Sequence, residues 1–135
     1  MKTYLDANVF LYAFLDQDAG KKQKSVEIIA RLLESDSGFI SLQVVREFCN
    51  VMVKKSSKTL SELRGALRIF DSFQLIDGSM LLVRRALEIR DRYDVRFFDS
   101  LHLAAAEAAG CNEFLTEDLN DGQMYGSVRA VNPFK

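Results

Sequence analysis

The sequence predicts an α/β fold, a three-layer α/β/α domain with a short-stranded, mostly parallel central sheet of about five strands. Short apolar segments rich in β-prone residues alternate along the chain with longer segments whose apolar residues recur at helical spacing. This alternation favours a parallel sheet with helices on both faces. The 135 residues contain no repeat and no linker, so we expect a single domain spanning residues 1–135.

The N-terminal half is expected to form two strands and four helices. The first strand ends at Asp6, where an acidic residue interrupts an apolar run. Ser41 is a candidate N-cap for the helix that follows the second strand, and Thr59 with Glu62 forms a T-x-x-E capping box. The expected elements are, in chain order, strand 2–6, helix 7–15, helix 21–35, strand 37–42, a helix after Ser41 and a helix after Thr59.

The C-terminal half is expected to form three strands and two helices. Gly78 and Ser79 precede a long amphipathic helix that runs to about Tyr93. Asp99 is expected at the N-terminus of the next helix, which Gly110 closes as a C-cap. The expected elements are strand 73–77, a helix from 79 to about 93, helix 100–110, strand 113–116, loop 117–126 and strand 128–132.

Composition and charge narrow the class of protein. The net charge of −1 gives no general attraction to nucleic acid, so a polyanion would be held by local basic patches or by bound cations. Cys49 and Cys111 form no C-x-x-C pair and are expected to be reduced core residues. No signal peptide is recognisable, and the longest apolar stretch is far below the ~18 residues that span a bilayer. We therefore expect a cytoplasmic protein with no membrane contact.

Acidic residues follow several elements at the edge where a parallel sheet binds its ligands. Asp6 follows the first strand and Glu47 lies early in the helix after the second. Asp99 begins a helix and Asp118 follows the fourth strand, so all four are expected beyond the carboxyl ends of the strands. Two unit charges 4 Å apart repel by about 4 kcal/mol at an effective dielectric near 20. The cluster therefore requires raised pKa values or a cation.

Carboxylate oxygens without cysteine or histidine ligands suit Mg²⁺ or Mn²⁺. One or two such ions can activate water for in-line attack on a phosphodiester. Each acid also has an ordinary structural explanation when taken alone: Asp99 as a helix cap, Glu47 as a solvated helix residue and Asp118 as a turn residue. Asp6 is the hardest to explain this way, because an acid inside an apolar junction costs stability unless it is paired.

At these residues the sequence resembles the PIN-domain nucleases, and specifically the VapC-type toxins of type II toxin–antitoxin systems. The matching stretches are "YLDANVFLYAF" (4–14), "ISLQVVREF" (40–48), "FFDSLHLAAAE" (97–107) and "FLTEDLNDG" (114–122), which together span nearly the whole chain. The resemblance implies catalytic, metal-binding acids at Asp6, Glu47, Asp99 and Asp118. It implies supporting roles for Asn8, Thr116 and, more weakly, Ser41, while Asp121 could share or supplement the role of Asp118. Glu117 is expected to point away.

The resemblance also implies an activity and partners. Members are Mg²⁺- or Mn²⁺-dependent endoribonucleases, commonly homodimeric, that cut structured RNA such as tRNA and are inhibited by a small antitoxin protein. Lys54, Lys55 and Arg96 are candidate RNA contacts, whereas His102 is expected to pack rather than to act in catalysis. The alternatives are a housekeeping or DNA-directed PIN nuclease, a non-catalytic Mg²⁺-binding module of the receiver type, and an RNA-binding scaffold.

Overall fold

The computed structural model describes residues 1–135 and confirms the three-layer α/β architecture, with a mostly parallel sheet of six strands in the order β3-β2-β1-β4-β6-β5. Every neighbouring pair is parallel except β5 and β6. The strands are β1 (Thr3–Leu5), β2 (Gly38–Ser41), β3 (Gln74–Ile76), β4 (Glu113–Leu115), β5 (Met124–Tyr125) and β6 (Val128–Val131).

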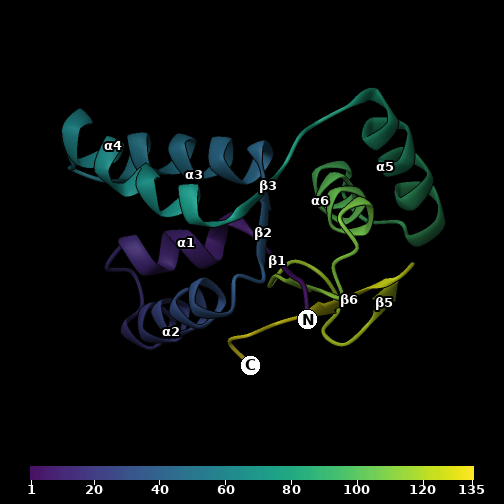
Figure 1. The fold of residues 1–135 in the computed structure, drawn as a ribbon, viewed down its shortest axis with the longest axis horizontal. Helices are drawn as coiled ribbons and strands as arrows, with labels where there is room; N and C mark the ends of the chain where they lie inside the picture. The colour runs from purple at the N-terminus through teal and green to yellow at the C-terminus, as the bar shows by residue number, and fades with distance from the viewer.

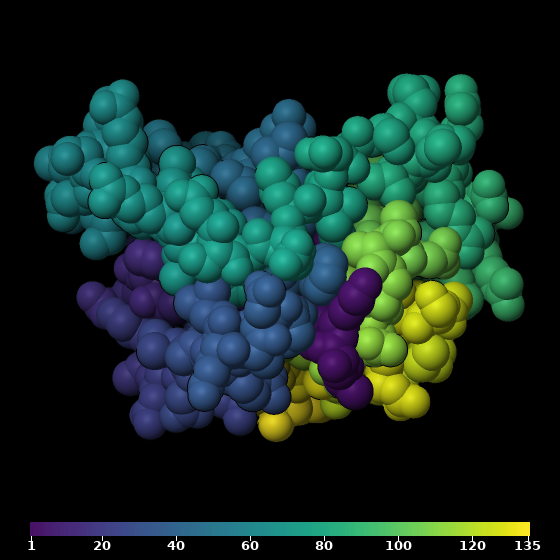
Figure 2. All heavy atoms as spheres, viewed as in Figure 1, coloured from purple at the N-terminus to yellow at the C-terminus, as the bar shows by residue number.

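Helices cover both faces of this sheet. Figure 1 shows α1 to α4 on one side and α5 with α6 on the other, while Figure 2 shows the N-terminal residues at the surface of the same view. None of the helices has the length and apolar character that crossing a bilayer requires. The helices are α1 (Ala7–Phe14), α2 (Ala19–Ser35), α3 (Leu42–Lys55), α4 (Leu60–Leu67), the 3₁₀ helix η1 (Arg68–Ser72), α5 (Met80–Tyr93) and α6 (Phe97–Ala108).

The core fixes the end of the central strand β1 from both faces. On the side of α1 to α4, the ring of Phe10 packs edge-on against Phe70 and Phe73, with centroids 4.7 and 5.2 Å apart. On the other side, consecutive alanines of α6 are buried and allow the helix to approach the sheet closely. Tyr4 and Leu5 of β1 are fully buried between these layers. The residue that follows them is therefore held in a rigid setting.

Two predicted helix ends are confirmed in atomic detail. Thr59 and Glu62 form the capping box, each side chain accepting from the other residue's backbone N–H. Gly110 follows α6 in the left-handed conformation, with φ of 74°. The backbone N–H of Gly110 donates to Glu107 and that of Cys111 to Ala106, at 3.0 and 2.9 Å, which is a Schellman motif.

Some predicted boundaries are wrong, each for a local reason. The predicted loop 117–126 contains β5, a two-residue strand too short to show alternation, which turns back into β6 at Gly126 with φ of 61°. The helix after Thr59 tightens into η1 before β3. Helix α6 begins at Phe97, so Asp99 lies in its first turn rather than before it. Arg96 occupies the N-cap, and no Ser, Thr, Asp or Asn marks this start.

The order of the strands changes direction beside β1. From β1 the chain continues to β2 and β3 on one side, whereas β4, β6 and β5 lie on the other. The change of direction between β1 and β4 is a topological switch point, where open α/β sheets bind ligands at the carboxyl ends of the strands. Asp6 follows β1 and Thr116 follows β4 at this place.

Candidate active site

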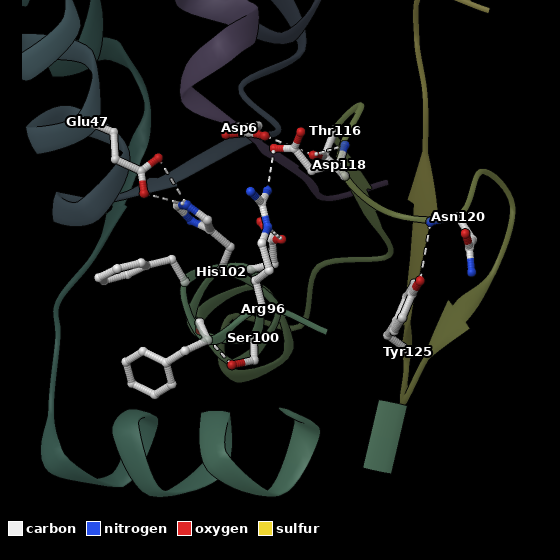
Figure 3. Close-up of polar contacts among 12 residues, drawn as sticks. Asp6, Glu47, Arg96, Ser100, His102, Thr116, Asp118, Asn120 and Tyr125 are labelled. Atoms are coloured by element: carbon white, nitrogen blue, oxygen red, sulfur yellow. Dashed lines mark hydrogen bonds and ion pairs between the residues drawn. The ribbon is translucent and has the colours of Figure 1, made fainter. Parts of the chain in front are cut away.

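Asp6 occupies the first position beyond β1 and is 4% exposed. It is the N-cap residue of α1, but its side chain caps no backbone N–H. Its Oδ2 instead accepts a hydrogen bond of 2.8 Å from the hydroxyl of Thr116, which is also buried. The same hydroxyl accepts from the backbone N–H of Asp118 at 3.1 Å. Thr116 thus joins the end of β1 to the loop after β4 (Figure 3).

Glu47 reaches the site from α3 and is held from two directions. Its Oε1 and Oε2 lie 3.2 and 3.3 Å from Nε2 of His102, on α6. Gln43, one turn earlier on α3, donates from Nε2 to Oε1 at 2.8 Å. One donor atom each from Asp6, Glu47 and His102 lie within 4.8 Å of one another. Figure 3 shows the Glu47 carboxylate facing the imidazole ring of His102.

Asp99 and Asp118 meet through Arg96. Nε of Arg96 donates to Oδ2 of Asp99 at 2.9 Å, and its Nη2 lies 3.6 Å from Oδ2 of Asp118. The Asp99 side chain is 8% exposed, whereas that of Arg96 is 73% exposed. In Figure 3 the guanidinium reaches toward Asp118, beside Asp6. A solvent-exposed cation of the protein itself therefore neutralises part of the acidic cluster.

The acids differ in how readily they ionise. Burial raises the pKa of Asp6 from 3.8 to about 6, and the nearby Asp118 and Glu47 add to the rise, although His102 and Thr116 oppose it. Burial also raises the pKa of Asp99, against the effect of Arg96. For Glu47, burial alone acts to raise the pKa, but hydrogen bonds from His102 and Gln43 outweigh it, so the pKa is lowered.

The acids fall into two adjoining groups: Asp6 and Glu47 lie close together beside His102, whereas Asp99 and Asp118 meet at Arg96. Asp6 is buried beside other acids, and its raised pKa shows that the protein alone does not fully compensate its charge. Oxygen donors of this kind match the preference of Mg²⁺ and Mn²⁺. The one nitrogen donor in the cluster, Nε2 of His102, is already engaged with Glu47.

The predicted supporting residues lie in different surroundings. Ser41 occupies the N-cap position of α3, but its hydroxyl does not cap the helix and instead lies 2.7 Å from the hydroxyl of Tyr4. Asn8, on α1, is half-buried and its side chain makes no hydrogen bond within the protein. Asp121 is exposed, and its Oδ1 accepts from the backbone N–H of Asn132 at 2.8 Å. Of the two loop aspartates, Asp118 is the one that pairs with Arg96.

Glu117 points away from the acids, as predicted. Its two carboxylate oxygens bind the hydroxyl of Tyr12 and Nζ of Lys21, each at 2.6 Å. The two candidate RNA-binding lysines, Lys54 and Lys55, are exposed in the last turn of α3. Seven residues separate Lys54 from Glu47, which corresponds to about 10 Å along the helix.

Sequence reasoning missed the polar role of Tyr4 and underestimated that of His102. Tyr4 lies in a buried strand, where its hydroxyl bonds Nδ1 of His102 at 2.7 Å. His102 is 2% exposed and packs against Tyr4 and Phe114, as predicted. Both of its ring nitrogens are nevertheless hydrogen-bonded. The signal available was the spacing of Asp99 and His102, which places them one turn apart on one face of α6.

Comparison with known proteins identifies the family to which this fold belongs. The model of the PIN domain family matches residues 3–121. Among solved structures, a toxin–antitoxin complex from Klebsiella pneumoniae is similar, with a TM-score of 0.67 and 22% identity over 98% of each chain. VapC20 of Mycobacterium tuberculosis, a toxin that cleaves the sarcin–ricin loop, has a TM-score of 0.67 and 18% identity over 95% of this chain and 99% of that one.

VapBC2 from Rickettsia felis, bound to a DNA fragment from its promoter, has a TM-score of 0.66 and 20% identity over 86% of this chain and 87% of that one. No curated protein sequence matches the chain. At these identities the structures establish the fold, whereas the family match covers most of the sequence. The chain belongs to the PIN domain family, whose members are nucleases.

Proposed function

We propose that the protein is an Mg²⁺- or Mn²⁺-dependent endoribonuclease that acts as the toxin of a toxin–antitoxin pair. The observation that carries the proposal is the buried Asp6 carboxylate, which lies near Glu47 and Asp118 at the switch point of the sheet. Asp99 is joined to Asp118 through Arg96. The PIN family match and the similar folds of several toxins support it. The family match disfavours the receiver-type alternative.

In this mechanism the acidic side chains would bind the cation and its water, and neighbouring residues orient the acidic side chains. Asp6, Asp99, Asp118 and Glu47 supply oxygen ligands for one or two ions, and Thr116 orients Asp6. A divalent ion held by these oxygens would supply activation of the attacking water and neutralisation of charge on the phosphodiester. Glu47 has a lowered pKa and is partly exposed, so its ionised carboxylate can accept a hydrogen bond from that water.

Arg96 serves the substrate in the same proposal. Its guanidinium is largely exposed, so solvent weakens its ion pairs with Asp99 and Asp118. If Asp99 and Asp118 held a metal ion, the Arg96 guanidinium would be free to bind a phosphate oxygen of the RNA. Lys54 and Lys55 extend the positive charge along α3. Asn8 lies two residues after Asp6, and its side chain has no hydrogen-bond partner in the protein, so we propose that it is available to a water or ligand.

Structured RNA is the proposed substrate class, with tRNA and ribosomal RNA as its members to be tested first, and the cytoplasm is the proposed compartment. A cognate antitoxin protein is the proposed inhibitor, by analogy with the toxin–antitoxin complexes of similar fold.

A homodimer is also proposed. Exposed apolar side chains on α5, including Met80, Leu81 and Leu87, support it because they offer a surface that a second subunit could bury.

The test offers purified tRNA, ribosomal RNA and duplex DNA to the wild type, Asp118→Asn and Asp121→Asn, with Mn²⁺ present. We expect discrete RNA fragments from the wild type and from Asp121→Asn, and loss of cleavage in Asp118→Asn. Mapping the fragment ends identifies the bond that is cut. Cleavage of DNA in preference to RNA would replace the substrate class, and equal activity of the two variants would remove Asp118 from the site.

A further inference from the structure

We propose that His102 is a positioning residue that fixes the Glu47 carboxylate for metal binding, and that Tyr4 and Ser41 in turn fix His102. The proposal rests on the proposed function, because it gives Glu47 the role of a metal ligand. It assigns a task to a buried histidine and tyrosine that the metal-binding acids alone leave unexplained. The observation behind the proposal is a series of hydrogen bonds that runs from the sheet through α6 to α3.

This series of hydrogen bonds is continuous and almost entirely buried. The hydroxyl groups of Ser41 and Tyr4 lie 2.7 Å apart, and the Tyr4 hydroxyl lies 2.7 Å from Nδ1 of His102. Nε2 of His102 then lies 3.2 and 3.3 Å from the two oxygens of Glu47. Tyr4 is fully buried, His102 is 2% exposed and Ser41 is 8% exposed. Four elements, β1, β2, α6 and α3, thus meet in one polar network.

The direction of each hydrogen bond follows from the acceptor at its end. An ionised Glu47 carboxylate can only accept, so Nε2 of His102 carries the hydrogen that it donates. In a neutral imidazole, Nδ1 is then an acceptor, and the Tyr4 hydroxyl donates to it. The Ser41 hydroxyl completes the series by donating to the Tyr4 oxygen.

This order leaves His102 no free lone pair for a metal. Nδ1 is occupied by Tyr4 and Nε2 points its hydrogen at Glu47. Metal-binding side chains are commonly held in this way by an outer hydrogen-bond partner that fixes their orientation. Gln43 restrains the same carboxylate from the other side and is itself bonded to the backbone oxygen of Phe98 at 3.3 Å. Glu47 is therefore restrained although its side chain is 38% exposed.

The test measures Mn²⁺ binding by calorimetry, which requires no RNA. His102→Gln and His102→Asn form a matched pair, because the glutamine amide nitrogen extends to the place of Nε2 and the asparagine nitrogen only to that of Nδ1. We expect His102→Asn to weaken Mn²⁺ binding by about 10- to 100-fold, the usual effect of losing such an outer partner. His102→Gln should restore most of the affinity.

A double-mutant cycle with Glu47→Ala separates positioning from direct ligation. If His102 acts through Glu47, the His102→Asn change has no further effect on Mn²⁺ affinity in the Glu47→Ala background. An equal loss in both backgrounds would make His102 a ligand and overturn the proposal, as would wild-type affinity in His102→Asn. Tyr4→Phe keeps the ring packing and removes only the hydroxyl, so it should weaken Mn²⁺ binding while its metal-free melting temperature shows that the fold persists.

The same measurement distinguishes this proposal from the proposed function. Wild-type protein that binds Mn²⁺, together with loss of binding in Asp6→Asn, supports the metal site whatever happens at His102. Absence of Mn²⁺ binding by the wild type would contradict the metal-dependent function itself. Normal binding by His102→Asn would contradict only the positioning role.

Discussion

Replacing Asp6 by asparagine should stabilise the protein when no metal is present. The pKa of Asp6 is about 6 in the folded chain, against an ordinary value of 3.8. One pKa unit corresponds to 1.36 kcal/mol, so this difference in pKa destabilises the native state with ionised Asp6 by about 3 kcal/mol. Asparagine carries no charge and its amide oxygen can still accept the hydrogen bond of Thr116. We therefore expect a gain of about 2–3 kcal/mol at pH 7.5.

The way in which wild-type stability depends on pH explains why Asp6→Asn should be stabilising. Because the folded protein binds the Asp6 proton more tightly than the unfolded chain, wild-type stability falls as the pH rises from about 4 to about 6 and the penalty remains above that range. The advantage of Asp6→Asn should thus be absent at pH 4 and complete above pH 7. For a chain of this length, the gain corresponds to a rise in melting temperature of roughly 8–12 °C.

The assay is thermal and urea unfolding in EDTA at several pH values. Asp121→Asn is the matched control, because its carboxylate is exposed and bonded to a backbone N–H outside the cluster, and it should bring no gain. Asp99→Asn should gain less than Asp6→Asn, because it also loses its partner Arg96. A melting temperature of Asp6→Asn equal to or below that of the wild type between pH 6 and 8 would refute the electrostatic reasoning.

Three further predictions concern the same cluster. Arg96→Gln removes the cation that pairs with Asp99 and Asp118, so calorimetry should show tighter binding of Mn²⁺. The free energy of unfolding without metal should fall by at most about 1 kcal/mol. Unchanged Mn²⁺ affinity would show that Arg96 does not compete with the ion. Thr116→Val should lower the unfolding free energy by about 1–3 kcal/mol in urea at pH 7, because Asp6 loses its donor, and wild-type stability would contradict this. The rise in melting temperature that Mn²⁺ causes should grow between pH 5 and 7 as Asp6 loses its proton, whereas a pH-independent rise would argue against Asp6 as a ligand.

Much of the fold could be predicted because local signals and tertiary packing agree. The capping box of Thr59 and the glycine at 110 marked helix ends through contacts within one turn. The start of α6 could not be predicted in this way, since Arg96 occupies its N-cap and supplies no capping side chain. Strand β5 escaped detection because two residues carry no periodic pattern, and its pairing with β6 is what defines it.

The sequence indicated the clustered acids more readily than the residues that hydrogen-bond to them. Asp6 stood out because a carboxylate in an apolar junction needs a reason, and Asp118 followed from the edge that parallel strands share. Ser41 was expected to cap a helix, but its hydroxyl is hydrogen-bonded to that of Tyr4, which lies 37 residues earlier in the chain on another strand. Such contacts depend on the register between β1 and β2, which no local pattern reveals.

The most direct test of the central claim compares RNA cleavage by the wild type and Asp6→Asn, each with Mn²⁺ and then with excess EDTA. The account predicts discrete fragments from the wild type with Mn²⁺, no fragments with EDTA, and none from Asp6→Asn although it folds more stably without metal. Fragments from Asp6→Asn equal to those from the wild type, or cleavage that persists in EDTA, would contradict a metal-dependent nuclease site at this edge of the sheet.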